Sequence, residues 1–214
     1  MDVLTHNFSV YGQGFLGTVE LTVYASLLAL ALGFVMASFR VSPVRSLRAL
    51  GTVWVTVLRN TPLTLLFFAV VLGLPRFGLV LPFQLFAVLA LGCYTSAFIC
   101  EVLRSGINTV PTGQGEAARS LGMSFGQTLG TVVLPQAFRT VIPPIGSTLI
   151  ALAKNSAIAG AFSVTELLGT YKILSEMGFD IIWIFIWIAV GYLIITLSIS
   201  ALFHVLEKRW GVAR

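Results

Sequence analysis

The chain has 214 residues, of which 57% are hydrophobic and 10% are charged, and its formal net charge is +5. Soluble domains carry roughly 25% charged residues, so this composition excludes a soluble globular protein and predicts an all-α integral membrane protein, one domain over residues 1–214. Most of the basic residues flank apolar segments. They are therefore explained by membrane topology, and no nucleic-acid partner is expected.

Five apolar segments are long enough to cross a lipid bilayer, whose hydrocarbon core takes roughly 20 residues of helix. The predicted transmembrane helices cover about residues 15–39, 51–74, 79–103, 140–160 and 181–206. The fourth is the weakest, because Pro143, Pro144, Lys154 and Asn155 interrupt it. Proline removes a helical hydrogen bond, so we expect Pro143 and Pro144 to break this span.

Basic residues predict the orientation of the spans. With the N-terminus outside, ten of the 13 Lys and Arg residues, Arg214 among them, lie in cytoplasmic stretches, and Arg76 and Lys172 lie outside. Cytoplasmic loops of membrane proteins carry this excess of positive charge. We therefore expect a multi-pass protein of the cytoplasmic membrane, with its N-terminus outside and its C-terminus in the cytoplasm.

The longest connection, residues 105–138 between the third and fourth spans, is predicted to be cytoplasmic and to contain two short helices. Thr112 is the expected N-cap of a first helix over residues 113–121. Gly122 is suited to the left-handed residue that follows a helix. Pro135 is expected to end the second helix.

Local patterns give this loop two further features. Ala117, Ala118 and Leu121 are expected to form one small apolar face on the first helix, and Ser124 and Gln127 have the spacing of a capping box at the start of the second. Helices this short are not stable alone. We therefore expect another protein to pack against the loop.

A motif with defined spacing lies in the same loop. Glu116-Ala117-Ala118 is followed after three residues by Gly122, after nine more by Val132, and then by Leu134-Pro135. This pattern resembles the EAA motif of the permease subunits of ABC importers, which implies a coupling helix that docks on an ATP-hydrolysing subunit. The expected coupling residues are Glu116, Ala117, Ala118, Leu121, Gly122, Leu134 and Pro135. The alternative is an ordinary amphipathic loop at the membrane surface.

Other stretches resemble the polar amino acid uptake branch of the ABC importers. YTSAFICEVLRSGINTVPTGQGEAARSLG carries this resemblance, and VSPVRSLR and RNTPLTL are most similar to the glutamate-uptake permease subunit of actinobacteria. The resemblance covers about residues 15–160. It implies import of a polar amino acid, L-glutamate first, by alternating access. Related permeases carry arginine, glutamine, aspartate or cystine.

The resemblance also implies partners: a homologous second permease subunit, two ATP-binding subunits that hold ATP and Mg, and an extracellular amino acid-binding protein. This chain is not expected to be an enzyme. A phosphate loop needs a Gly-Lys pair, but Lys154, Lys172 and Lys208 follow Ala, Tyr and Glu. No cofactor is expected in this chain and, because His6 and His204 are isolated, no metal site either.

Polar groups within the spans are the candidate substrate contacts, because ionisable groups in a membrane are costly. Lys154 is placed to pair with a substrate carboxylate, while Asn155 and Ser156 supply hydrogen bonds, and the family resemblance also places the amino acid site here. The alternatives are a lysine that snorkels to the outer interface or one that pairs with Glu101 or Glu166.

The third span offers further candidates. Glu101 is placed to meet the positive end of the substrate, with Tyr94 and Ser96 lining its path. A structural ion pair between Glu101 and Arg104, three residues on, is an equal alternative. Helix–helix hydrogen bonds are the alternative for Tyr94 and Ser96.

Two proline sites are candidate gates or hinges. Asn60, Thr61 and Pro62 mark the expected inner end of the second span, where a hinge or simple helix entry are the alternatives. Pro143 and Pro144 are assigned the same hinge role in the fourth span, since broken helices near a substrate site are typical of transporters.

A rival function is an ion-coupled secondary transporter, with Lys154 and Glu101 as its ion or proton relay. Such folds carry internal repeats, which the five predicted spans do not show.

Overall fold

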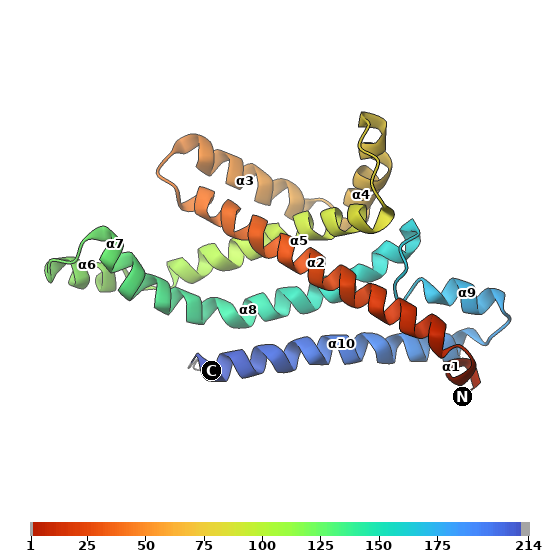
Figure 1. Cartoon of the computed structure of the whole chain (residues 1–214). Helices are drawn as coiled ribbons and strands as arrows, with labels where there is room; N and C mark the ends of the chain where they lie inside the picture. The colour runs from red at the N-terminus through yellow and green to blue at the C-terminus, as the bar shows by residue number, and fades with distance from the viewer. Residues whose placement is uncertain (1, 211–214) are drawn as a thin grey trace.

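The computed structural model describes residues 2–210 and, over that part of the chain, consists of helices and connecting segments without a strand (Figure 1). Met1 and residues 211–214, including Arg214, lie outside the described residues. The all-α prediction is therefore confirmed for the described part. The α-helices are α1 (Asp2–His6), α2 (Phe8–Val41), α3 (Arg45–Asn60), α4 (Leu63–Phe68), α5 (Phe83–Asn108), α6 (Thr112–Ser120), α7 (Phe125–Gln127), α8 (Leu134–Asn155), α9 (Thr170–Glu176) and α10 (Ile181–Arg209). The π segments are η1 (Ala69–Gly73) and η3 (Thr128–Val133), and the 3-10 segments are η2 (Leu74–Phe77) and η4 (Ser156–Phe162).

Four helical stretches are long and apolar enough to cross a membrane, and they overlap the first, third, fourth and fifth predicted spans. They are Phe8–Val41, Phe83–Asn108, Phe125–Phe162 and Ile181–Arg209. A fifth crossing exists if Arg45–Asn60 and Leu63–Phe77, which meet at an angle of 108°, are counted as one span.

The bend divides the predicted span over residues 51–74 into two helices at the proline site. Thr61 is extended (φ −97°, ψ 129°), the conformation that a residue before proline favours, and α4 begins after Pro62. The side chains of Asn60 and Thr61 donate to carbonyls one turn earlier, at 2.7 and 2.8 Å. The proline site therefore lies at a corner between two helices.

Pro143 and Pro144 do not break α8, so this prediction is wrong. The two carbonyls that lose a helical donor belong to Arg139 and Thr140, four residues earlier, and both residues are exposed. Their carbonyls are therefore not trapped in the apolar core, and α8 continues past both prolines.

Pro135 does not end the second loop helix, which is a further correction. It lies in the first turn of α8, where a missing N–H costs least. The π segment η3 leads directly into α8, and the side-chain amide of Gln136 donates to the carbonyl of Val132 at 2.8 Å. The chain is consequently helical from Phe125 to Phe162.

Helix α5 lies at the centre of the bundle, between α2, α3 and α8 (Figure 1). Small residues let it approach α2 closely, as is common between membrane helices. A Cβ on Gly33 would come within 2.6 Å of Ile99, and one on Gly92 within 2.6 Å of Leu28.

Helix α10 packs on the other side of α8 and exposes large apolar side chains along most of its length.

A fully buried carboxylate, Glu166, fastens the connection between η4 and α9 to its surroundings. It accepts hydrogen bonds from the amide of Leu168 (2.8 Å), from the amide of Gly169 and from the hydroxyl of Tyr192 on α10 (2.6 Å). The amide of Leu167 donates to Thr18 of α2 at 2.9 Å. The far end of the α8 stretch is thereby joined to both α2 and α10.

Burial raises the pKa of Glu166, although its three hydrogen bonds act in the opposite direction. The folded protein therefore holds this proton more tightly than the unfolded chain does. The resulting stabilisation is fully present below the unfolded pKa of about 4.3 and is lost as pH rises through the raised folded pKa.

We therefore expect the melting temperature of the wild-type protein, relative to that of Glu166→Gln, to fall as the pH is raised above about 4.3. Thermal unfolding in detergent, followed by tryptophan fluorescence across a pH series, measures this difference. Glu176→Gln is the matched control, because Glu176 is exposed on α9. A difference between wild type and Glu166→Gln that does not change with pH would contradict the raised pKa.

Candidate functional site

The loop after α5 forms α6 and α7 at the end of the bundle where α10 ends, whereas α1 lies at the opposite end (Figure 1). Helix α6 begins at Thr112, and Pro111 is its N-cap, so the predicted Thr112 cap is wrong. Pro111 (φ −58°, ψ 136°) holds the chain extended directly before the helix. Thr112 is thereby placed inside the first turn.

The turn after α6 has the predicted geometry. Gly122 has a left-handed backbone conformation (φ 81°). Its amide donates to the carbonyl of Arg119 at 2.9 Å, and the amide of Met123 donates to the carbonyl of Ala118 at 3.2 Å. These two bonds form a Schellman motif. The capping box is present as well: the hydroxyl of Ser124 accepts from the amide of Gln127 (3.3 Å), and the Gln127 side chain accepts from the amide of Ser124 (2.9 Å). These bonds fix the orientation of α6 relative to α7.

The predicted coupling residues divide between the surface and the interior. Glu116, Ala117 and Leu121 are exposed, but Ala118 is buried, because it lies about 100° round the helix from Ala117. The expected single face of Ala117, Ala118 and Leu121 is therefore wrong. Phe125, which was not predicted, is 78% exposed and follows Leu121, which is 84% exposed, by four residues. The remaining three motif residues, Gly122, Leu134 and Pro135, are exposed as well.

We call the exposed set Glu116, Ala117, Leu121 and Phe125 the coupling surface. Two large apolar side chains on a polar loop are typical of a protein contact site. The position of Phe125 directly after the capping Ser124 was the sequence signal for it.

Lys154 lies in the last turn of α8 and is exposed. Within residues 2–210 its ammonium group makes no hydrogen bond or ion pair, so neither of the expected alternative partners, Glu101 and Glu166, is paired with it. Asn155 beside it is partly exposed. Ser156 is buried, and its hydroxyl donates to a carbonyl of the preceding turn at 2.7 Å. The structure therefore brings together Lys154 and Asn155 but turns Ser156 into the core.

Lys154 terminates a continuous stripe along α8. Between Thr140 and Asn155, the exposed residues are Thr140, Pro144, Ser147, Ala151 and Lys154. At 3.6 residues per turn, all five fall within about 80° of one another. None is a large apolar residue, in contrast to the isoleucine, leucine and aromatic side chains that α10 exposes. We call this stripe the uncovered face of α8.

Glu101 lies between two arginines. Its carboxylate pairs with Arg40 of α2 and with Arg104 one turn on, the latter at 2.9 Å. The ion pair with Arg104 given as an alternative is thus present, whereas the pair with Arg40, 61 residues away, was not predicted. Arg59 forms no ion pair within the described chain, and its guanidinium lies 5.4 Å from the ring centre of Phe98.

A cavity of about 330 Å³ opens beside these charges. Arg59, Glu101 and Arg104 line it, together with Thr140 and Pro144 of the uncovered face of α8. We call it the arginine cavity. It contains both charge signs and reaches the same α8 stripe as Lys154.

Tyr94 and Ser96 are engaged in packing within the bundle. Ser96 is buried, donates to the carbonyl of Cys93 at 2.6 Å and accepts from the indole of Trp54 at 3.0 Å, which joins α3 to α5. Tyr94 packs against Phe98, with ring centres 5.1 Å apart. The helix–helix hydrogen bond given as the alternative is therefore present for Ser96, whereas the ring contact of Tyr94 lies within α5.

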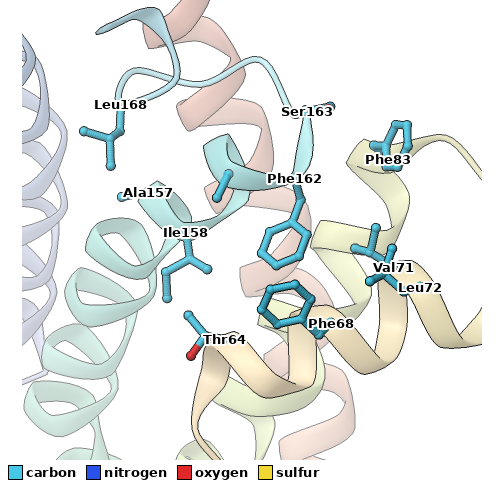
Figure 2. A pocket seen from close by; sticks show the side chains of 11 residues that line it. Thr64, Phe68, Val71, Leu72, Phe83, Ala157, Ile158, Phe162, Ser163 and Leu168 are labelled. Carbon is cyan, nitrogen blue, oxygen red and sulfur yellow. The ribbon is translucent and has the colours of Figure 1, made fainter. Parts of the chain in front are cut away.

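A larger cavity of about 610 Å³ lies between α4 and η4 (Figure 2). Phe162 points across it toward Phe68, with ring centres 5.0 Å apart, and stacks on Phe67 at 5.2 Å. Thr64 and Ser163 supply the only side-chain hydroxyls among its lining residues. With no charged side chain in its wall, this cavity is poorly suited to the two or more charges of an amino acid.

Comparison with known proteins identifies the family. A family model described as "Binding-protein-dependent transport system inner membrane component" matches residues 29–212. The chain is 41% identical over 211 residues to the glutamate transport system permease protein of Corynebacterium glutamicum, covering 92% of each. It is 38% identical over 209 residues to the probable glutamine ABC transporter permease protein of Bacillus subtilis, covering 98% of this chain and 97% of the relative.

Solved structures agree. One described as an amino acid ABC transporter with histidines matches with a TM-score of 0.90 and 30% identity, covering 96% of each chain. An inward-facing methionine ABC transporter matches with a TM-score of 0.77 at 20% identity, which shows the shared fold. The chain therefore belongs to the inner membrane components of binding-protein-dependent transport systems and is an amino acid ABC transporter permease.

Proposed function

We propose that this permease carries L-glutamate into the cell by alternating access along the uncovered face of α8. The observation that carries the proposal is Lys154, an unpaired cation at the end of this polar stripe. An ammonium there suits a carboxylate, and Asn155 adds a hydrogen-bonding group. The 41% identity to a glutamate permease supports the same cargo.

The membrane itself supports a path at this face. Polar groups on a helix are costly against hydrocarbon and are placed against protein or water. A homologous second permease subunit covering α8 would enclose a polar route between the two chains. An extracellular binding protein would deliver the amino acid to its outer end.

The coupling surface supports the energy source. Leu121 and Phe125 are free to enter an apolar groove on an ATP-binding subunit, and two such subunits would hold ATP and Mg. The stretch from Phe125 to Phe162 is helical throughout. Movement imposed on α7 would therefore reach Lys154 through one continuous element.

Orientation and hinges complete the proposal. The coupling surface and the end of α10 share one end of the bundle (Figure 1), which fits the proposed orientation with the N-terminus outside and the C-terminus in the cytoplasm. The corner at Asn60, Thr61 and Pro62 is the proposed hinge between α3 and α4. Pro143 and Pro144 weaken α8 without breaking it, so they are proposed to permit bending.

A second candidate cargo is glutamine, favoured by the 38% identity to a probable glutamine permease. Lys154 would then pair with the α-carboxylate, which both amino acids carry. Competition of labelled glutamate uptake by glutamine, aspartate and arginine separates these cargoes.

Removing the cation should impair transport. In the assembled transporter with saturating binding protein, we expect Lys154→Ala to lower the rate of glutamate uptake roughly tenfold or more, since a charge-assisted contact is lost. Lys154→Arg should retain most of the rate. Lys172→Ala, on exposed α9, is the matched control. Unchanged uptake by Lys154→Ala would remove this residue from the site.

Charging the coupling surface should separate the permease from its ATPase. We expect Leu121→Asp and Phe125→Asp to lower co-purification of the ATP-binding subunit roughly tenfold, because a carboxylate would have to enter an apolar groove. Phe77→Asp is the control, since Phe77 is 88% exposed and lies outside α6 and α7. Full ATPase assembly with both loop variants would contradict the coupling assignment.

A further inference from the structure

We propose that the arginine cavity is a second carboxylate-binding site, which the amino acid occupies after leaving Lys154 and which selects for acidic cargo. This inference rests on the proposed function, because it takes the uncovered face of α8 as the transport path. It adds a site whose charge, rather than that of Lys154, distinguishes glutamate from glutamine.

The charges around the cavity do not balance. Glu101 is the one carboxylate paired with both Arg40 and Arg104, and Arg59 has no ion pair in the described chain. Three guanidinium groups therefore face one carboxylate. Arg59 is exposed beside the cavity, so its guanidinium is open to an added anion, which the excess of positive charge attracts. Guanidinium groups bind carboxylates with directed, charge-assisted hydrogen bonds.

Hydroxyl groups in the wall suit the other end of an amino acid. Thr109 donates to the carbonyl of Gly106 at 2.7 Å, and Thr140 donates to that of Ala137 at 2.8 Å. The two hydroxyl oxygens also lie 3.3 Å apart, where either can donate to the other. A hydroxyl oxygen has two lone pairs, so this pair can still accept a hydrogen bond from an ammonium group. The volume of about 330 Å³ lies at the lower end of the range for small-molecule sites.

The cavity is continuous with the uncovered face of α8. Pro144 and Thr140 belong to both, and Pro144 lies ten residues before Lys154, or about 15 Å along the helix. An anion can thus pass between the two cationic sites past Ser147 and Ala151, without crossing a large apolar side chain. The same stretch of α8 also lacks a large apolar side chain that a lipid tail could pack against. This favours an amino acid over a lipid phosphate as the anion in the cavity.

The test uses Arg59, because this arginine lines the cavity and forms no ion pair with any other described residue. The transporter with all its subunits is reconstituted in liposomes, and ATP-dependent uptake of labelled glutamate and glutamine is measured. We expect Arg59→Gln to lower glutamate uptake roughly tenfold or more and to raise the glutamine-to-glutamate ratio by a similar factor. Arg59→Lys should restore most of the glutamate rate. Arg48→Gln, an exposed arginine three turns earlier on α3, is the matched control and should leave both rates unchanged.

Each outcome decides between the two proposals. Absence of ATP-dependent glutamate uptake in the wild type would refute the proposed function itself. Wild-type uptake of glutamate by Arg59→Gln would overturn the second site alone. If Arg59→Gln does not assemble, Arg104→Gln carries the same test, with loss of glutamate uptake and retained glutamine uptake expected. An anionic phospholipid bound by the wild type and lost from Arg59→Gln in native mass spectrometry, with unchanged uptake, would assign the cavity to lipid and overturn the proposal.

Discussion

A polar helix face cannot remain against hydrocarbon, and this constraint governs the molecule. Helix α8 is covered by α5 on one side and α10 on another, yet its stripe from Thr140 to Lys154 is left open by the chain. A second permease subunit and a water-filled path are what would satisfy it. The described chain leaves this stripe uncovered, while α10 presents large apolar side chains of the kind that lipid requires.

The two ends of the α8 stretch are held differently. At one end, the Schellman turn at Gly122 and the capping box of Ser124 fix a small exposed surface but leave it without a partner in the described chain. At the other end, Glu166 joins the connection after η4 to α10, and Thr18 joins it to α2. A push at the coupling surface would thus act on a helix whose far end is anchored.

Features with local causes could be predicted from the sequence, and features with distant causes could not. The apolar segments, the left-handed Gly122 and the capping box depend on a few neighbouring residues. Whether Pro143 and Pro144 break α8 depends on where the carbonyls that lose a donor lie. The ion pair between Arg40 and Glu101 depends on how α2 packs against α5. The α8 stripe had a readable signal, a spacing of three and four residues up to Lys154. The burial of Ser156 had none, because it follows from the change to a 3-10 helix at that residue.

Cysteine accessibility along α8 would test the transport path most directly. In the nucleotide-free transporter, with Cys93 and Cys100 replaced by serine, single cysteines would be placed at Ser147 and Ala151 and, as buried counterparts, at Leu149 and Leu152. A small charged thiol reagent is expected to modify positions 147 and 151 and to be slowed by glutamate, while positions 149 and 152 stay unmodified. Equal labelling of both pairs, or no labelling of positions 147 and 151, would contradict a path along this face.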